Sequence, residues 1–225
     1  MAFSSFVQQW ADIGIKAGYG YNILLNFDIM NDDNFSYEHS WGNSWGGKLG
    51  WNFNYNNEVV VEVMSTQFNQ KFTYSIDGVP GSKKFKMRTL DIPLIWRNNK
   101  DKIGSYSEIG PQISIVRRAS DNGNDVVDQY KHTYFSIVAG IGNYVAGTDN
   151  TGLAMGIRLI YALQDIVSDE GAANGYPTAP YGNAESSKKA SNPLSVLFMI
   201  ELNHDFGYLI SSGCQQRKKL ILFNL

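Results

Sequence analysis

Apolar and polar residues alternate with a period of two over much of the chain. Between Ile13 and Tyr21 the odd positions are Ile, Ala or Tyr, and the even positions are Gly or Lys. Successive side chains of a β-strand point to opposite faces, so this period predicts a strand with one apolar face. We expect eight such strands, at 13–21, 48–55, 58–74, 84–96, 106–115, 134–142, 153–161 and 194–203.

The fourth stretch shows the pattern most clearly. From Leu90 to Trp96 every even position is Leu, Ile or Trp, whereas Asp91 falls on the opposite face. Pro93 in this strand and Pro111 in the next cannot donate a ladder hydrogen bond. We therefore expect an interrupted ladder, with bulges or strand ends, at both prolines.

The connections between the expected strands alternate strictly in length. The longer ones follow the first, third, fifth and seventh strands, at 26–43, 77–82, 119–129 and 164–192, whereas the others are short turns such as 97–102. Antiparallel outer-membrane barrels have short periplasmic turns and longer extracellular loops. The pattern predicts an eight-stranded antiparallel up-and-down transmembrane β-barrel with a C-terminal extension and both termini in the periplasm.

The non-apolar face distinguishes this barrel from a soluble one. It holds Gly, Ser, Asn and Gln with few charges of both signs, whereas a solvent-exposed face usually carries many more Lys and Glu. We expect the apolar face to contact lipid and the charges to form structural ion pairs in the lumen. Lys16 is expected beside Glu201, and Asp91 beside Arg158 or Lys48. The expected lumen charges are Lys16, Lys48, Glu62, Asp91, Glu108, Arg158 and Glu201.

Composition supports an all-β membrane protein and excludes other classes. Aromatic residues make up 13% of the 225 residues and charged residues only 18%. A net charge of -2 argues against a nucleic-acid partner. The nearest approach to a spanning helix, Leu194 to Leu202, is broken by polar residues and too short. Aromatic residues at strand ends are expected to form interfacial girdles: Tyr19, Tyr21, Trp51, Phe53, Tyr55, Trp96 and Tyr161.

The chain divides into three segments. Residues 1–10 are expected to be a leader remnant or N-terminal segment, 11–203 the barrel, and 204–225 a periplasmic tail. The tail holds the single cysteine, Cys214, which cannot form an internal disulfide. It ends in a basic run and an apolar segment that could pair with a strand of a partner protein: Leu220, Ile221, Leu222, Phe223 and Leu225.

Candidate chemistry is sparse. The three histidines, His39, His132 and His204, do not share a strand at metal-ligand spacing, so we expect neither a metal nor a cofactor. His132 with Ser136 would be the pair of a membrane lipid hydrolase, but no carboxylate that could orient the histidine is identifiable. The sequence predicts a protein that is not an enzyme.

The motifs around the prolines resemble the PorT-like outer-membrane β-barrel family of Bacteroidetes. The matching residues are Leu90, Pro93, Leu94, Gly110 and Pro111, together with the stretch 14–18 and the strand of Glu62. The resemblance covers nearly the whole chain from Asp12 to Asn203 and implies a barrel associated with envelope assemblies such as type IX secretion. It implies no catalytic residues, and the chain departs from the family pattern by continuing beyond the last strand.

The function expected from these observations is an anchor or accessory subunit of a multiprotein envelope assembly, for secretion or barrel biogenesis. Its partners would be outer-membrane lipid and other outer-membrane or periplasmic proteins. The alternative is a surface binding protein or adhesin that uses the loops 26–43 and 164–192. A lipid-modifying outer-membrane enzyme is a third possibility.

Overall fold

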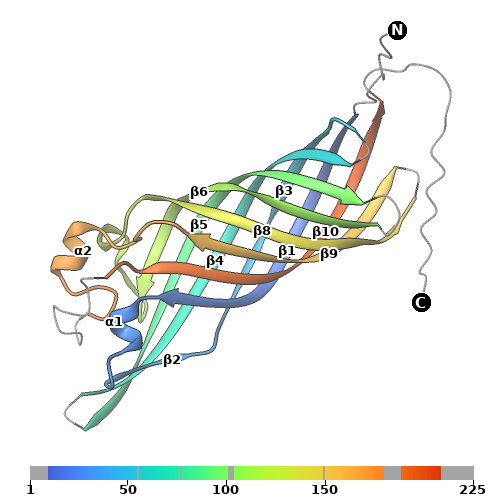
Figure 1. Ribbon diagram of the computed structural model, residues 1–225. Coiled ribbons are helices and arrows are strands. Elements are labelled where there is room, and N and C mark those ends of the chain that lie inside the picture. Colours follow the sequence, from blue (N-terminus) through green and yellow to red (C-terminus); the bar gives the residue numbers. More distant parts are fainter. Residues whose placement is uncertain are drawn as a thin grey trace.

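The protein is a closed β-barrel of eight antiparallel strands (Figure 1). The computed structural model describes residues 10–54, 56–76, 78–100, 104–148, 150–179 and 189–208. Each ring strand pairs with its neighbours in the chain, and β1 pairs with β10 to close the ring. The expected fold class is confirmed. The ring strands are β1 (Trp10–Leu25), β3 (Ser40–Asn52), β4 (Asn57–Ile76), β5 (Val79–Lys100), β6 (Ser105–Asp121), β8 (Thr133–Gly147), β9 (Thr151–Ala162) and β10 (Asn192–Tyr208).

The two ends of the barrel differ. One end, called the loop end here, holds the short helices and strands that the structure describes outside the ring (Figure 1). The opposite end, called the turn end, holds the start of β1, the end of β10 and the connections from β3 to β4, β5 to β6 and β8 to β9. The loop-end elements are α1 (Phe27–Met30), β2 (Phe35–Glu38), β7 (Asn124–Asp125), η1 (Val127–Gln129) and α2 (Asp169–Ala173).

Side chains alternate between the lumen and the outside along every ring strand. On β5, Leu94 and Trp96 are 51% and 52% exposed, whereas Asp91 and Ile95 are 3% and 0% exposed. Large apolar side chains are exposed around the ring, including Ile15 on β1, and charged ones are buried inside. This inside-out distribution is that of a barrel whose outer face lies in lipid.

Among the described residues, no helix is both long and apolar enough to cross a membrane.

Several strands extend beyond their expected ends. Arg97 belongs to β5 rather than to a charged turn, and β10 runs to Tyr208 rather than ending at Asn203. Residues 41–43 lie in β3 and 119–121 in β6, although both were expected in loops. The reason is that neighbouring strands continue the hydrogen-bond ladder past the apolar stretch: Trp10 still pairs with Tyr208.

The strict alternation of long and short connections is wrong at β4 and β5. Here the connection is as short as a hairpin turn, since Ile76 pairs with Val79. Instead, the strands themselves are long, with 20 and 22 residues, and they project past the rest of the barrel at the loop end (Figure 1). Gly78, with φ of 77°, allows the tight reversal. The projecting hairpin therefore takes the place of the expected loop.

Pro93 interrupts the ladder, but it does not create a bulge. The β4–β5 pairing stops at Val61 with Leu94 and resumes at Met64 with Asp91 in the same register. Proline lacks the N–H that the intervening bonds would need. The expected interruption is confirmed, whereas the expected bulge or strand end is wrong because β5 continues on both sides.

Pro111 behaves in the same way. The β5–β6 ladder skips Pro111 between the pairs that involve Gln112 and Ile109, again without a change of register. The register shift between these strands lies between Arg88 and Thr89, near the loop end. The distortion is therefore displaced from both prolines.

The loop end has an apolar core of its own, which we call the loop-end core. Aromatic side chains from the projecting parts of β4 and β5 pack against residues of the connections after β6 and β9, and Phe85 stacks on Tyr130 with ring centroids 4.8 Å apart. The buried members are Leu24, Ile29, Phe35, Phe68, Phe72, Phe85, Met87, Val116, Ala119, Tyr130, Tyr134, Ala162, Ile166 and Val167.

Candidate functional site: the charged lumen

The ion pairs of the lumen begin where the ring closes. Lys16 on β1 and Glu201 on β10 are cross-strand partners, and their charged atoms lie 2.8 Å apart, so the expected pairing is confirmed. The Lys16 ammonium also lies 2.6 Å from Glu62 on β4. These side chains are at most 1% exposed, so the lysine joins two walls of the lumen without solvent between them.

Arg158 on β9 joins two further carboxylates. Its Nη1 lies 2.6 Å from Glu62, and its Nη2 lies 2.7 Å from Glu108 on β6. Its Nε also donates to Glu108 at 2.8 Å. The planar guanidinium thus uses its fork of donors to connect β4, β6 and β9.

Arg97 was expected in the turn 97–102, but it lies in β5 and points into the lumen. Its side chain is fully buried. Nη1 lies 2.7 Å from Oε1 of Glu201, and Nη2 lies 2.7 Å from Oε2 of the same carboxylate. Nη2 also lies 2.9 Å from Glu108. In a bidentate arginine–carboxylate pair of this kind, two parallel charge-assisted hydrogen bonds add both energy and a fixed geometry.

The ring of Tyr106 lies beneath Arg97. The guanidinium carbon is 4.3 Å from the centroid of the ring, a cation–π contact. The tyrosine can fold against the wall because β8 and β9 present glycine there: a Cβ on Gly142 would meet the ring at 2.4 Å, and one on Gly156 would meet its hydroxyl at 2.7 Å. The two glycines therefore leave the room that Tyr106 occupies.

Lys48 holds a third group of carboxylates nearer the turn end. Its ammonium lies 2.8 Å from Asp12, 2.9 Å from Glu58 and 3.0 Å from Glu201. Glu201 therefore contacts three cations, one on each of β1, β3 and β5. It therefore connects the group around Lys48 to Lys16 and Arg97.

Asp12 and Arg97 were missed because the expected strands stopped one residue short of each, whereas Glu58 was missed although it is the first residue of the expected strand 58–74. All three have the parity of the lumen residues on their own strands. Extending the period of two by one position at 13 and at 96, and applying it from the first residue of the strand 58–74, would have found them. The network contains four cations and five carboxylates: Lys16, Lys48, Arg97 and Arg158 with Asp12, Glu58, Glu62, Glu108 and Glu201.

Apolar side chains fill the lumen beside the network. Met64 follows Glu62 on β4, on its loop-end side, and packs with Leu197 and Met199 of β10. A second cluster joins Val60, Ile95 and Val138, and both clusters contact Ile160. Ion pairs and aliphatic groups together therefore close the middle of the barrel.

Asp91 is not part of the network. The expected partners Arg158 and Lys48 bind other carboxylates, and among the described residues no lysine or arginine forms an ion pair with Asp91. Its Oδ1 has no hydrogen-bond partner, although the side chain is 3% exposed. The strand register explains the difference, because Asp91 lies opposite Met64 and Ser114, displaced toward the loop end.

Replacing this carboxylate, which has no cation partner among the described residues, should stabilise the barrel. We expect Asp91→Asn to raise the free energy of unfolding by about 1 kcal/mol, because an amide of similar shape can keep hydrogen bonds with Thr66, Thr89 and Ser114 and avoids burying a charge that no cation compensates. Denaturant unfolding in micelles, followed by tryptophan fluorescence, measures the change. The matched control is Glu62→Gln, which removes the same charge from a paired position and should destabilise by about 3 kcal/mol or more. An equal loss of unfolding free energy in both variants would contradict the view that Glu62 is compensated by cations and Asp91 is not.

The loop-end core encloses one further ion pair. Lys83 on β5 lies 2.6 Å from Asp121 on β6, and its ammonium is 5.1 Å from the ring centroid of Tyr176. It also donates to the backbone carbonyl of Ala179. Burial raises the pKa of Tyr130 in this core well above its usual value, so the hydroxyl stays protonated. These contacts attach the connection after β9 to the barrel wall.

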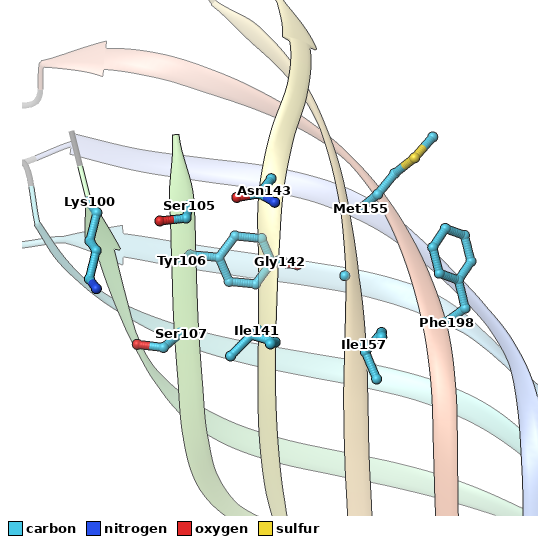
Figure 2. A pocket seen from close by; sticks show the side chains of 11 residues that line it. Lys100, Ser105, Tyr106, Ser107, Ile141, Gly142, Asn143, Met155, Ile157 and Phe198 are labelled. Carbon is cyan, nitrogen blue, oxygen red and sulfur yellow. The ribbon is translucent and has the colours of Figure 1, made fainter. Parts of the chain in front are cut away.

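A groove of about 420 Å³ lies on the wall formed by β6, β8, β9 and β10 (Figure 2). Ile141, Ile157 and Phe198 on its border are 66%, 54% and 50% exposed. Figure 2 shows these side chains spread along neighbouring strands, with Lys100 nearer the turn end. Because exposed apolar side chains form its border, the groove opens toward lipid.

The residues considered for catalysis are not brought together. Ser136 faces the lumen and is 2% exposed, whereas His132 is exposed outside. His204 lies 3.3 Å from the Thr151 hydroxyl, far along the chain from either. In the described part of the chain, no group of three or more His, Cys, Asp or Glu residues could hold a metal ion.

Some expected features lie outside the described residues. These are Tyr55 of the expected girdles, Cys214, and the apolar end of the tail. Of the other girdle residues, Tyr19, Trp51, Phe53 and Trp96 are exposed, and Tyr21 and Tyr161 are partly exposed. The tail residues concerned are Leu220, Ile221, Leu222, Phe223 and Leu225.

No protein-family model matches the chain, and no curated protein matches it. Among solved structures, it is similar to Neisserial surface protein A, with 14% identity and a TM-score of 0.48 over 87% of this chain and 97% of that one. It is also similar to the outer membrane protein OprG from Pseudomonas aeruginosa, with 9% identity and a TM-score of 0.44 over 89% and 97%. A third is Ail, the attachment invasion locus protein of Yersinia pestis, with 9% identity and a TM-score of 0.35 over 88% and 99%.

Three features of this chain identify it as a membrane barrel. The ring is closed, its lumen is charged and packed, and its outer face is apolar. Only helices and closed barrels satisfy every backbone hydrogen bond within lipid. The chain is a small β-barrel of the outer-membrane type.

Proposed function

We propose that the protein is a non-enzymatic anchor or accessory subunit of a multiprotein assembly in the bacterial envelope. In this proposal the barrel lies in the outer membrane, with the turn end and both termini in the periplasm. The loop end then faces the cell exterior. Its partners are outer-membrane lipid and other outer-membrane or periplasmic proteins.

The observation that supports this role best is the filled lumen. The ion network, the aliphatic clusters and the loop-end core occupy successive levels of the barrel. Eight strands leave an interior just wide enough for side chains to fill it. A barrel filled in this way does not serve as a pore, so its outer surfaces and ends remain for interaction.

The resemblance to PorT-like barrels favours a secretion-linked subunit over other surface roles. The motif residues around the two prolines lie in β5 and β6: Leu94 faces outward at 51% exposure, and the Leu94 carbonyl oxygen fills the space that a Cβ on Gly110 would need. These are positions of the barrel wall and not of a catalytic cleft. The proposal takes type IX secretion or barrel biogenesis as the process served.

Site-specific photo-crosslinking in intact cells tests the proposal. The photoreactive residue is placed at exposed positions outside the apolar band, Phe27 and Val79 at the loop end and Phe206 at the turn end, with lipid-facing Ile15 as the control. We expect one recurrent protein adduct from one of these ends and none from Ile15. Adducts at no position, or equally at all four, would contradict a specific assembly.

Planar-bilayer recording tests the filled lumen separately. We expect the purified barrel to show no conductance above background, because closely packed ion pairs at most 5% exposed leave no water-filled path. Discrete openings would contradict this. Changes in lipid A composition that depend on the protein would contradict the non-enzymatic part of the proposal.

The tail is a candidate connector to the partner. In this part of the proposal its apolar end, 220–225, pairs with a strand of another protein. Deletion of residues 215–225 should prevent the partner from binding, so that its crosslink no longer forms, without unfolding the barrel. A partner that stays bound to the shortened protein would show that the tail does not connect them.

A surface binding protein or adhesin is the second candidate. The observation that favours it is the order of the loop end, where the loops pack on a buried core and expose Phe27 and Met30 on α1 at 62% and 50%. Apolar groups presented by a rigid support are typical of binding surfaces. Ligand-dependent protection of α1 in hydrogen exchange would support this candidate, and protection confined to the turn end would exclude it.

A further inference from the structure

A row of basic side chains runs along the outer face of the barrel at the loop end. We call it the cationic ridge and define it as the outward-facing basic residues of three neighbouring strands. Five of its six residues are exposed and the sixth, on β4, is partly exposed. The ridge consists of Lys71 on β4, Lys84, Lys86 and Arg88 on β5, and Arg117 and Arg118 on β6.

The ridge continues the lipid-facing surface directly. On β5 the outward positions from Trp96 to Leu90 are apolar, and the next outward position is Arg88. One such step is two residues, or about 6–7 Å along the strand. On β6 the outward position after Ile115 is Arg117. The cations therefore begin where the apolar band ends, at the level of lipid headgroups.

The ridge is confined to one side of the barrel. On β1 and β3 the outward positions near the loop end are aromatic, and Tyr19 stacks on Trp41 with ring centroids 5.5 Å apart. Aromatic rings at this level are common anchors at a membrane interface. The wall formed by β4, β5 and β6 has basic side chains at this level, so it contacts the headgroup region through positive charges and not through aromatic rings.

Like charges face each other across the strands of the ridge. Lys71 is the direct partner of Lys84, and Arg88 is the direct partner of Arg118. Directly opposed like charges destabilise a sheet unless something compensates them. Among the described residues only Glu38 forms an ion pair with the ridge, at 2.7 Å from Lys71.

The register shift adds to this concentration of charge. It lies between Arg88 and Thr89 of β5 and leaves both Arg117 and Arg118 exposed on β6. A strict alternation would have turned one of the two arginines into the lumen. The local distortion thus places an additional guanidinium on the outer face.

From these observations we infer that the cationic ridge binds the phosphate groups of anionic lipids in the leaflet at the loop end. Guanidinium groups bind phosphate in a bidentate manner, and lysines add point charges. A lipid phosphate between two opposed cations would relieve their repulsion. The acyl chains of the same lipid would extend along Leu90, Ile92 and Leu94. A nucleic acid or a soluble polyanion would have no use for that adjoining apolar face.

Lipid adducts of the purified, folded barrel test the inference. The barrel is reconstituted in nanodiscs of phosphatidylcholine with a minor fraction of phosphatidic acid, whose headgroup is a phosphate monoester, and bound lipids are counted by native mass spectrometry. We expect wild-type protein to enrich phosphatidic acid. The triple variant Lys86→Gln, Arg88→Gln and Arg118→Gln should reduce this enrichment about tenfold or more, since each cation near an anionic surface contributes several-fold to binding.

The matched control removes the same charge elsewhere. It is the triple variant Lys100→Gln, Lys131→Gln and Lys189→Gln, which leaves the ridge intact and should keep the wild-type enrichment. A second ridge variant, Lys86→Arg, Arg88→Lys and Arg118→Lys, retains the charge and should also retain most of the enrichment. It separates loss of charge from loss of fold.

Two outcomes would overturn the inference. Equal enrichment in the ridge and control variants would show that the ridge does not select the lipid. Displacement of phosphatidic acid by millimolar inorganic phosphate, with phosphate itself retained on the protein, would show a free-phosphate site instead. We expect inorganic phosphate to leave the lipid adducts unchanged, because it lacks the acyl chains that contact the apolar band.

Discussion

Replacing Arg97 with methionine is expected to lower the free energy of unfolding of the barrel by about 3–5 kcal/mol. The variant removes the bidentate pair with Glu201, whose two N–O distances are 2.7 Å, and the contact of Nη2 with Glu108 at 2.9 Å. Three cations would then face five buried carboxylates. Because the lumen offers little water to solvate them, the cost is that of leaving buried charge uncompensated, not merely that of the lost bonds.

Denaturant unfolding in detergent micelles or lipid vesicles measures this loss. Arg88→Met is the matched control, since it removes an exposed arginine from the same strand and should change the stability by less than about 1 kcal/mol. The double variant Arg97→Met with Glu201→Gln should recover part of the loss by restoring the charge balance. A single variant as stable as wild type would show that water enters the lumen and solvates these carboxylates.

The lipid-facing and lumen-facing positions could be predicted from the sequence because the period of two is a property of the strand itself. Ile15, Leu94 and Trp96 were all expected to face lipid and are 66%, 51% and 52% exposed. Lys16 and Glu201 could be paired because only one closure of eight strands brings β1 beside β10. Such inferences need local alternation and chain order, and nothing more.

The partners of the other lumen charges could not be predicted in this way. They depend on the stagger between strands, which decides which residues share a level of the barrel. Asp91 was expected beside Arg158 or Lys48, but its strand neighbours are Met64 and Ser114. The charged run that begins at Arg97 resembles a turn, and only the neighbouring strand shows that the ladder continues through it.

The loop end could not be predicted because its elements depend on contacts between distant segments. The stretch 77–82 has the Gly and Pro of a loop, but the hairpin pairs nearly to its tip. Its inner face is covered by Tyr130 and residues of the connection after β9, and β2 adds to the edge of β4 through Phe35 and Tyr74. Period and turn composition carry no information about such coverage.

The loop-end core makes the second large effect predictable. Phe85→Ala should free the connections after β6 and β9 while leaving the membrane part of the barrel folded. Phe85 is fully buried and its ring packs against Tyr130 and Phe68, so truncation should cost the loop-end core about 3–5 kcal/mol. Opening of the loops should then become about a hundredfold more frequent or greater, which limited proteolysis detects as faster cleavage within 122–132 and 164–179.

The matched control for Phe85→Ala is Phe27→Ala, because Phe27 has the same side chain at the same end of the barrel but is 62% exposed. Its cleavage rate should stay within about twofold of wild type, since exposed substitutions cost little. Phe85→Leu retains most of the volume and should be intermediate. Unchanged cleavage in Phe85→Ala would mean that the loops are held without the loop-end core. Loss of the barrel together with the loops would mean that the two parts unfold as one unit, and the loop end would then be no separate support for a binding surface.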